Sequence, residues 1–168
     1  VIPKAKIWVG KRSIYSSTLT LIEGCVGLLD YDFEVFGEEK SINELIVKVF
    51  GKKEDDIKIA EKIHLNGKEA RGLAKSRLVL KDSAKAVVMG ETYGNAPLAR
   101  GHVDCIEIVN GEGVVARAIP VVYVKDKQAK VTHEAAIGSI DKKQMQTLMA
   151  RGLNEEEAVD VIVRGILG

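Results

Sequence analysis

The 168-residue sequence lacks the features that define several large protein classes. Its two cysteines, Cys25 and Cys105, are too few for a disulfide framework in a chain of this length, which favours a reducing, cytoplasmic setting. No apolar run approaches the roughly 20 residues that a membrane-spanning helix needs. The apolar stretches near the N-terminus are short and interrupted by charge, unlike a signal peptide. We therefore expect a cytoplasmic protein without membrane insertion.

An excess of either charge is also missing. The 25 Lys and Arg residues and 24 Asp and Glu residues leave a formal net charge of +1. This balance gives no basis for a strongly basic nucleic-acid-binding surface, so we expect no nucleic acid among the partners. With 46% hydrophobic and 29% charged residues, the composition is that of a globular chain with a real core.

Familiar catalytic motifs are absent as well. The sequence has no Walker-type phosphate loop, no Gly-x-Ser-x-Gly elbow, no His-Glu-x-x-His helix and no Cys-x-x-Cys pair. These absences indicate that the protein is not an enzyme of a familiar mechanistic class.

What is present is a pattern of short β-strands. Runs rich in Val, Ile, Thr and Tyr alternate with breaks that contain Gly, Asp or Asn. One run, residues 42–50, also fits a helical stripe, but its strand neighbours favour a strand. Many short strands could close as a sandwich, a barrel or a β-solenoid, and no strict internal repeat supports the last. Strands are predicted over residues 7–9, 18–22, 31–36, 45–50, 57–64, 77–80, 86–89, 103–109, 114–119, 121–124 and 129–132.

The pattern changes to helical near the C-terminus. Asp141 can cap a helix that ends at Gly152, with Gln144 as its capping-box partner. Asn154 can cap a second helix, with Glu157 at the corresponding position. The sequence therefore predicts a β-body over residues 1–138 and a helical appendage over residues 139–168, within a single folding unit.

One candidate site lies in the short segment from Gly101 to Cys105, which holds an imidazole, a carboxylate and a thiol. In a strand, Cys105 shares a face with Glu107, while His102 and Asp104 share the other face. His102 and Cys105 therefore cannot meet at one metal unless the strand bends. The alternative is that Cys105 is a small buried hydrophobe.

A second candidate site lies at the end of the last predicted strand, at His133 and Glu134. Imidazole is a ligand that suits iron, and thiolate suits iron–sulfur centres. Glu134 would point to the opposite face from His133 unless the strand ends or bulges there. A histidine that fixes the corner by hydrogen bonds remains the alternative. His64 and Cys25 have no suitable partner nearby, and we interpret both as structural.

These residues resemble a known family. The segment order resembles the C-terminal signature of the SufB/SufD proteins, non-enzymatic scaffold components of iron–sulfur cluster assembly. The 28 residues from Cys105 to His133 match the spacing between the SufB cysteine and its His-Glu pair. The resemblance is strong from Gly101 to Gly165 and weaker before it. It rests on His133-Glu134-Ala135-Ala136, Ile140-Asp141, Gln144, Arg151-Gly152-Leu153, Glu156-Glu157-Ala158, and Ile162 with Gly165.

The resemblance implies a mainly β fold, a right-handed parallel β-helix core with a C-terminal pair of short α-helices. It also implies that Cys105, His133 and Glu134 are candidate ligands of an iron–sulfur cluster, with Cys105 and His133 on iron. The cluster would be transient, and none would be tightly bound in an aerobic preparation. Two protomers could supply more ligands than one strand can.

The implied partners are a SufC-like ABC ATPase and a second chain, either an identical copy or a paralogous SufB or SufD chain. Full burial of Leu148, Met149, Val159 or Ile162 against the β-body would move the ATPase-docking surface elsewhere on the helices. On the resemblance, the residues expected to contact the ATPase are Gln144, Leu148, Arg151, Gly152, Glu157 and Ile162.

Two alternative functions stay open. The sequence lacks the clustered N-terminal cysteines of SufB, but it keeps Cys105, which SufD-like members generally lack and which favours the SufB-like role. The alternative is a SufD-like module that dimerises and binds the ATPase without holding a cluster. A β-solenoid enzyme acting on carbohydrate or acyl donors would need an aspartate cluster or a catalytic histidine in a groove, and the sequence shows neither.

Overall fold

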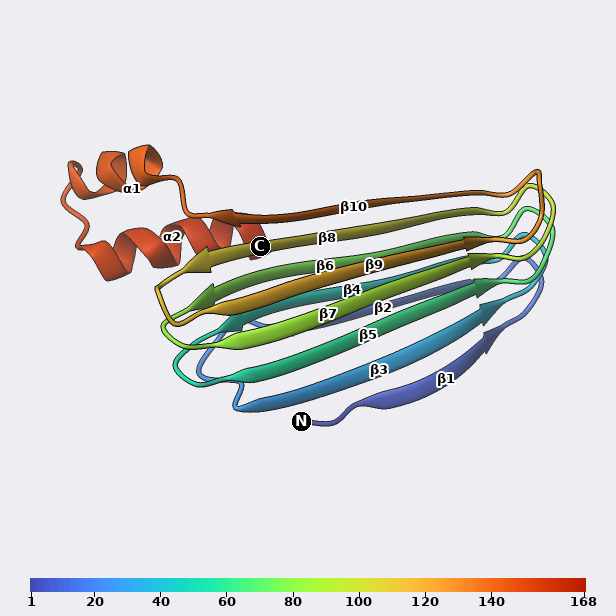
Figure 1. Ribbon diagram of the computed structural model, residues 1–168, viewed down its shortest axis with the longest axis horizontal. Coiled ribbons are helices and arrows are strands. Elements are labelled where there is room, and N and C mark those ends of the chain that lie inside the picture. Colours follow the sequence, from blue (N-terminus) through green and yellow to red (C-terminus); the bar gives the residue numbers. More distant parts are fainter.

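The computed structural model describes all 168 residues and confirms the predicted fold class: a β-solenoid of about five turns followed by two helices (Figure 1). The helices lie at one end of the long, flat β-body. The strands are β1 (Lys4–Val9), β2 (Ile14–Leu21), β3 (Leu28–Gly37), β4 (Ile42–Gly51), β5 (Asp56–Leu65), β6 (Arg71–Lys81), β7 (Lys85–Gly94), β8 (Arg100–Asn110), β9 (Val115–Val124) and β10 (Lys130–Ser139). The helices are α1 (Lys142–Met149) and α2 (Glu155–Leu167).

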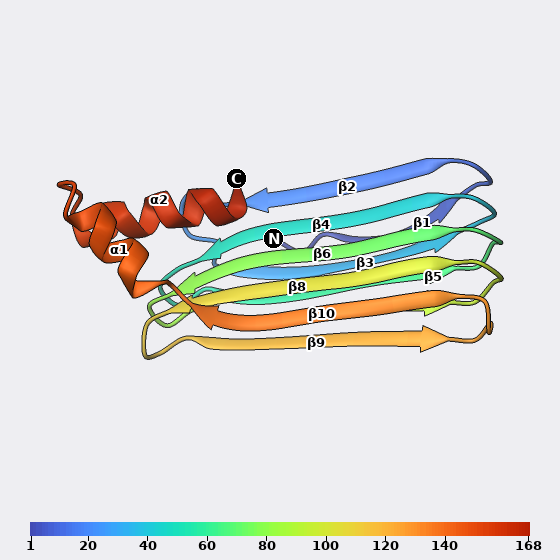
Figure 2. The ribbon, with the colours of Figure 1, turned by 90° about the horizontal axis from the view of Figure 1, so that it is seen from above.

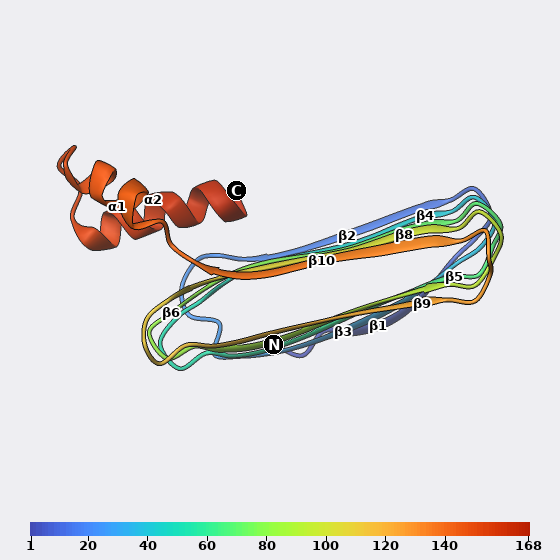
Figure 3. The same ribbon diagram turned by 45° about the horizontal axis from the view of Figure 1, so that its top comes forward.

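The strands form two parallel sheets that face each other (Figure 3). One sheet has the order β1-β3-β5-β7-β9 and the other β10-β8-β6-β4-β2, so each turn of the chain contributes one strand to each sheet. Every strand pair is parallel and in continuous register. The strands β9 and β10 are edge strands, each paired on one side only. Together they form the last turn, whose outer side we call the open end.

The turns recur at intervals of 28 to 30 residues, a periodicity that the sequence did not reveal. The odd strands after β1 begin at Leu28, Asp56, Lys85 and Val115. The repeat is hidden because equivalent positions hold unlike residues. One inward column of the odd-numbered sheet, for example, is occupied in turn by Phe33, Glu61, Gly90 and Pro120.

Burial alternates along the strands as a two-faced sheet requires. In β7, buried and half-buried residues alternate from Ala86 to Gly94. In β8, they alternate from Gly101 to Glu107. The buried residues pack between the sheets in two clusters, of 12 and 10 buried residues. A third cluster lies between the helices and the outer face of the even-numbered sheet.

Most predicted strands were too short, and two predictions differ more strongly from the structure. The segments predicted at residues 114–119 and 121–124 are the single strand β9, which contains Pro120. Proline is tolerated there because an edge strand leaves one side of its backbone unpaired. β10 continues to Ser139, well past its predicted end at residue 132. The ambiguous run at residues 42–50 is a strand, as predicted.

The outer face of the odd-numbered sheet carries a column of stacked rings. Neighbouring ring centroids are 4.4 to 5.3 Å apart, as expected for side chains in register on parallel strands. His64 belongs to this column, and its Nε2 lies 2.9 Å from Glu34 Oε1, which fits the structural role predicted for it. The column consists of Trp8, Phe36, His64, Tyr93 and Tyr123.

Both helices begin at the predicted caps. The Asp141 side chain accepts hydrogen bonds from the backbone N–H groups of Lys143 and Gln144. The capping box predicted at Asn154 and Glu157 is complete, with both reciprocal bonds present. Neither helix is long and apolar enough to span a bilayer. The caps fix where the chain leaves the last turn and turns back over the even-numbered sheet (Figure 2).

Candidate functional site

Cys105 lies on β8 with its side chain inside the solenoid. It is 3% exposed and belongs to a core cluster that includes Leu78. Burial raises the pKa of its thiol to about 12, and the carboxyl groups of Glu107 and Glu61 act in the same direction. Cys105 is therefore a neutral thiol at physiological pH, and a metal or a strong base is needed to form the thiolate.

Glu107 is the nearest polar neighbour of this thiol. It lies two residues further along β8, on the same face, and is fully buried. The Cys105 thiol donates to Glu107 Oε1 over 3.9 Å, while Glu107 Oε2 has no hydrogen-bond partner. Burial raises the pKa of Glu107 to about 7, although the bond from Cys105 opposes the rise. A thiol and a carboxyl thus lie side by side inside the solenoid.

A second buried carboxyl, Glu61, comes from β5 in the facing sheet. Its Oε2 accepts a hydrogen bond of 2.6 Å from Ser76, which is the register partner of Cys105 on the neighbouring strand β6. Burial raises the pKa of Glu61 to about 8, against the lowering effect of Ser76. Its other oxygen, Oε1, has no partner. The middle of the solenoid therefore holds two carboxyl groups, a thiol and a hydroxyl.

His133 and Glu134 occupy opposite faces of the last strand, β10. His133 pairs in register with the buried Val103, and Ala135 pairs with Cys105, so His133 and Cys105 share the inner face of the sheet. Glu134 pairs with Asp104 on the outer face. The pairing runs unbroken from Lys130 to Ser139, so no bulge brings Glu134 to the inner face.

No three His, Cys, Asp or Glu side chains come close enough to form a metal centre within the chain. Cys105 and His133 lie on neighbouring strands but are displaced by two positions along them. The structure thus places these two predicted residues on one face without assembling them into a finished site.

The outer face holds the other predicted residues of this segment in hydrogen bonds of their own. His102 Nδ1 lies 2.8 Å from Thr132 Oγ1. Asp104 forms a salt bridge with Arg77. The prediction that His102 and Cys105 lie on opposite faces is confirmed. Cys25 is exposed in a loop, far along the chain from these residues.

Residues 2–166 match the sequence family described as "SUF system FeS cluster assembly, SufBD core domain". The chain belongs to the SufBD family. The SufBD family protein of Methanocaldococcus jannaschii is 43% identical, an alignment that covers 99% of this chain and 52% of that protein. The Pyrococcus horikoshii protein is 38% identical over 100% of this chain and 51% of its own length. The chain spans about half the length of these curated relatives.

The inner face of this SufBD chain becomes solvent-exposed at the open end. His133 and Ala135 are exposed because no further strand covers β10. Ile137, on the same inner face, is 51% exposed. The open end therefore presents apolar side chains and unpaired strand edges that another protein chain could contact.

The helices of the SufBD chain use their apolar stripe to pack on the solenoid. Ile162 is 5% exposed and contacts a cluster with Phe50 and Val79 of the even-numbered sheet. The prediction that Ile162 contacts a partner is therefore not retained, since its side chain is already covered. Leu148 packs against the same cluster and is half-buried. Four of the six predicted residues remain exposed: Gln144, Arg151, Gly152 and Glu157.

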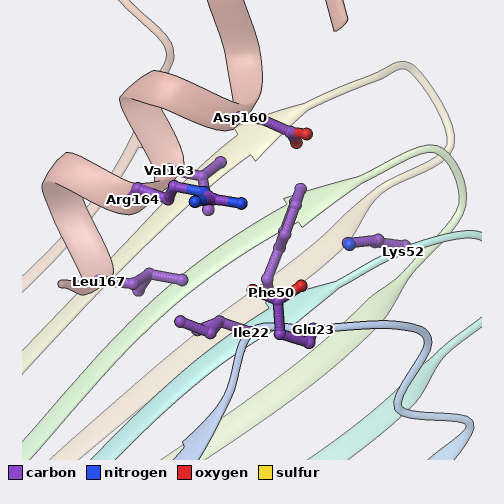
Figure 4. A pocket seen from close by; sticks show the side chains of 8 residues that line it. All are labelled: Ile22, Glu23, Phe50, Lys52, Asp160, Val163, Arg164 and Leu167. Carbon is purple, nitrogen blue, oxygen red and sulfur yellow. The ribbon is translucent and has the colours of Figure 1, made fainter. Parts of the chain in front are cut away.

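A small pocket lies between the C-terminal half of α2 and the β-body (Figure 4). Lys52 lies over the ring of Phe50, with its Nζ 4.2 Å from the ring centroid. The pocket mixes charged and apolar side chains, and it marks the seam between helix and sheet. It is lined by Ile22, Glu23, Phe50, Lys52, Asp160, Val163, Arg164 and Leu167.

Sequence reasoning missed Glu61 and Ser76 because their contact crosses from one sheet to the other. Strand alternation did place Glu107 on the face of Cys105. Its complete burial depends on the neighbouring turn of the solenoid and cannot be read from residues close to it in the chain. The sequence indicated only that a charged residue occupies an inward position of a strand.

Proposed function

We propose that this SufBD chain is a non-enzymatic component of iron–sulfur cluster assembly that holds iron or a nascent cluster transiently near the open end. Cys105 supplies a thiolate and His133 an imidazole. The observation that carries the proposal is their common inner face, on neighbouring strands of the last two turns. Glu134, on the outer face, is left out of this site.

The chemistry of the two side chains fits a transient cargo. Thiolate and imidazole are both established ligands of iron–sulfur centres. Because burial keeps Cys105 protonated, iron must displace the thiol proton, which makes binding weaker and dependent on pH. Two protein ligands leave the remaining positions to sulfide or water, so the cargo can be released.

Anaerobic reconstitution with iron and sulfide tests this assignment. We expect the cluster absorption of the unsubstituted protein to be lost in Cys105→Ser and strongly reduced in His133→Ala. Cys25→Ser is the matched control, because it removes the exposed cysteine and leaves the solenoid interior intact. Unchanged absorption in both Cys105→Ser and His133→Ala would refute the site.

We further propose self-association, with an identical or a paralogous chain, through the open end. The unpaired edges of β9 and β10 and the exposed Ile137 support this proposal. Ile137→Glu should shift the sedimentation coefficient to that of the monomer. Val161→Glu is the control, since Val161 is similarly exposed, at 47%, but lies on α2. A dimer that survives Ile137→Glu would contradict the open-end interface.

For the SufC-like ATPase, we propose a docking surface on the exposed side of the helices, including Gln144 and Arg151. Point substitutions test it better than truncation, because removal of α2 would uncover Phe50 and Val79. Arg151→Glu should weaken pull-down of the ATPase. Lys127→Glu, at the opposite end of the strands, should not change it. Equal retention of the ATPase by both variants would move the surface elsewhere.

Two observations favour the alternative of a module that dimerises and binds the ATPase without a cluster. Cys105 is a buried thiol of high pKa, and no three-ligand metal centre is preformed. Under this alternative, anaerobically purified protein stays colourless and iron-free after reconstitution while ATPase pull-down persists. Cluster absorption that depends on Cys105 would exclude it.

A further inference from the structure

The interior of the solenoid contains a carboxylate that the family resemblance does not assign to the site. Glu107 is 0% exposed, on the same face as Cys105, and its Oε1 accepts from the Cys105 thiol. Its Oε2 is buried without any hydrogen-bond partner. A buried, unpartnered carboxyl oxygen costs free energy, so its position beside a thiol points to a ligand that would satisfy it.

Glu134, the carboxylate implied by the family resemblance, has the opposite placement. It is exposed on the outer face of β10, in register with Asp104. The β10 ladder is regular, so Glu134 cannot reach the thiol of Cys105 without breaking strand pairing. Within one chain, only Glu107 presents a carboxyl oxygen directly to this thiol.

Access to the pair comes from the open end. Ala135, on the last strand, is the register partner of Cys105, and Ile137 is the register partner of Glu107. Both partners are exposed, and the side chain of Ala135 is small. Cys105 and Glu107 therefore lie only one strand below the surface of the solenoid's end.

We infer that Glu107, and not Glu134, is the carboxylate that joins Cys105 in binding a divalent transition-metal ion such as Fe²⁺. This inference rests on the proposed function, whose metal-binding thiol it shares. Thiolate and carboxylate are compatible ligands for such an ion. Binding replaces the S–H bond of Cys105 with an S–metal bond and releases one proton to solvent, without any change of oxidation state. The two residues make an incomplete site, so sulfide, water or a further side chain fills the other positions.

Anaerobic titration with Co²⁺ tests the inference, because a cobalt–thiolate bond gives a near-ultraviolet charge-transfer absorption. In a Cys25→Ser background, we expect this absorption to disappear in Cys105→Ser. Glu107→Gln should weaken Co²⁺ affinity by about tenfold or more. Glu134→Gln should leave affinity within about twofold, as should Glu61→Gln, which controls for loss of a buried carboxyl in the same interior.

Glu107→Asp keeps the carboxylate and should restore part of the affinity, and thermal melts of each variant confirm the fold. Loss of Co²⁺ binding in Glu134→Gln but not in Glu107→Gln would overturn the inference and leave the proposed function standing. So would equal affinity in all three carboxylate variants while the absorption still requires Cys105. Absorption that persists in Cys105→Ser would instead defeat the proposed site itself.

Discussion

The inner faces of β8 and β10 are the same surface of one sheet, one turn apart, yet they differ completely in exposure. Glu107 on β8 is fully buried, while its register partner on β10, the apolar Ile137, is 51% exposed. Residue type would predict the reverse. The difference teaches that burial in this fold is conferred by the next turn, so that the last turn presents core positions to solvent.

The largest expected effect comes from placing a charge at matched inner positions of the two strands. Val103→Asp buries an unpaired carboxylate in the closed interior and should cost on the order of 3 to 5 kcal/mol. His133→Asp, at the register partner on β10, should change the free energy of unfolding by only about 0.5 kcal/mol. Urea unfolding of dilute protein measures both. Similar losses in the two variants would show that the open end is as closed as the middle.

A smaller effect concerns the buried Glu61. Its folded-state pKa of about 8 lies above its ordinary value of 4.5. Between these values the folded protein holds a proton that the unfolded chain has lost, so this group makes stability fall as pH rises from about 4.5 to 8. Its contribution is on the order of a few kcal/mol.

Glu61→Gln should reduce the fall to the smaller part that the raised pKa of Glu107 contributes, while it keeps an oxygen that can accept from Ser76. Thermal melts from pH 4.5 to 8.5 measure the change. Glu134→Gln, on the exposed face, serves as control for the replacement of a glutamate by glutamine. A profile that is parallel in Glu61→Gln and the unsubstituted protein would mean that Glu61 is ionised in the folded state.

The third prediction concerns access through the open end. In a Cys25→Ser background, Ala135→Leu should slow the alkylation of Cys105 several-fold, because the larger side chain covers the thiol from the exposed side. Ala136→Leu adds the same bulk on the opposite face of β10 and should leave the rate unchanged. Equal rates in the two variants would show that reagents reach Cys105 through global unfolding.

The smallest expected effect comes from a comparison of two loops, the one between β7 and β8 and the one before β10. Leu98, in the turn between β7 and β8, has a φ of 60°, as do its counterparts Lys40 and Glu69 within a few degrees. Gln128, in the turn before β10, does not share this left-handed conformation; its N–H bonds Asp126 Oδ1 instead.

Leu98→Gly should therefore stabilise the fold by up to about 1 kcal/mol, because glycine relieves the left-handed strain. Gln128→Gly should destabilise it by about 0.5 to 1 kcal/mol. At this position glycine relieves no strain and only raises the conformational entropy of the unfolded chain. Chemical denaturation resolves effects of opposite sign. If both substitutions destabilise, the left-handed position carries no strain worth relieving.

Local features of this fold were predictable from sequence, and long-range ones were not. Asn154 and Glu157 form their capping box within four residues, so their pattern alone identified the start of α2. The alternation along β8 correctly separated Cys105 from His102. Both predictions needed only neighbours in the chain.

The solenoid period and the burial of Glu61 depend on residues far apart in sequence. Stacked turns require compatible shapes at equivalent positions but not similar residues, so Glu61 and Gly90 can occupy one column. The docking role given to Ile162 is not retained for a related reason. An apolar helical stripe indicates that something covers it, and here the covering surface is the chain's own sheet.

The unpaired edges of β9 and β10 also limit how copies of this chain can assemble. A parallel strand pair from another copy, added to the open end, would continue the ladder and leave a new unpaired edge. Pairing the open end with itself about a two-fold axis sets β10 antiparallel to β10 and uses up both edges at once. Such a pairing closes the open end with two chains and sets both Cys105 sites facing a shared seam. The same edge that could seed a fibre therefore also provides the means to terminate one.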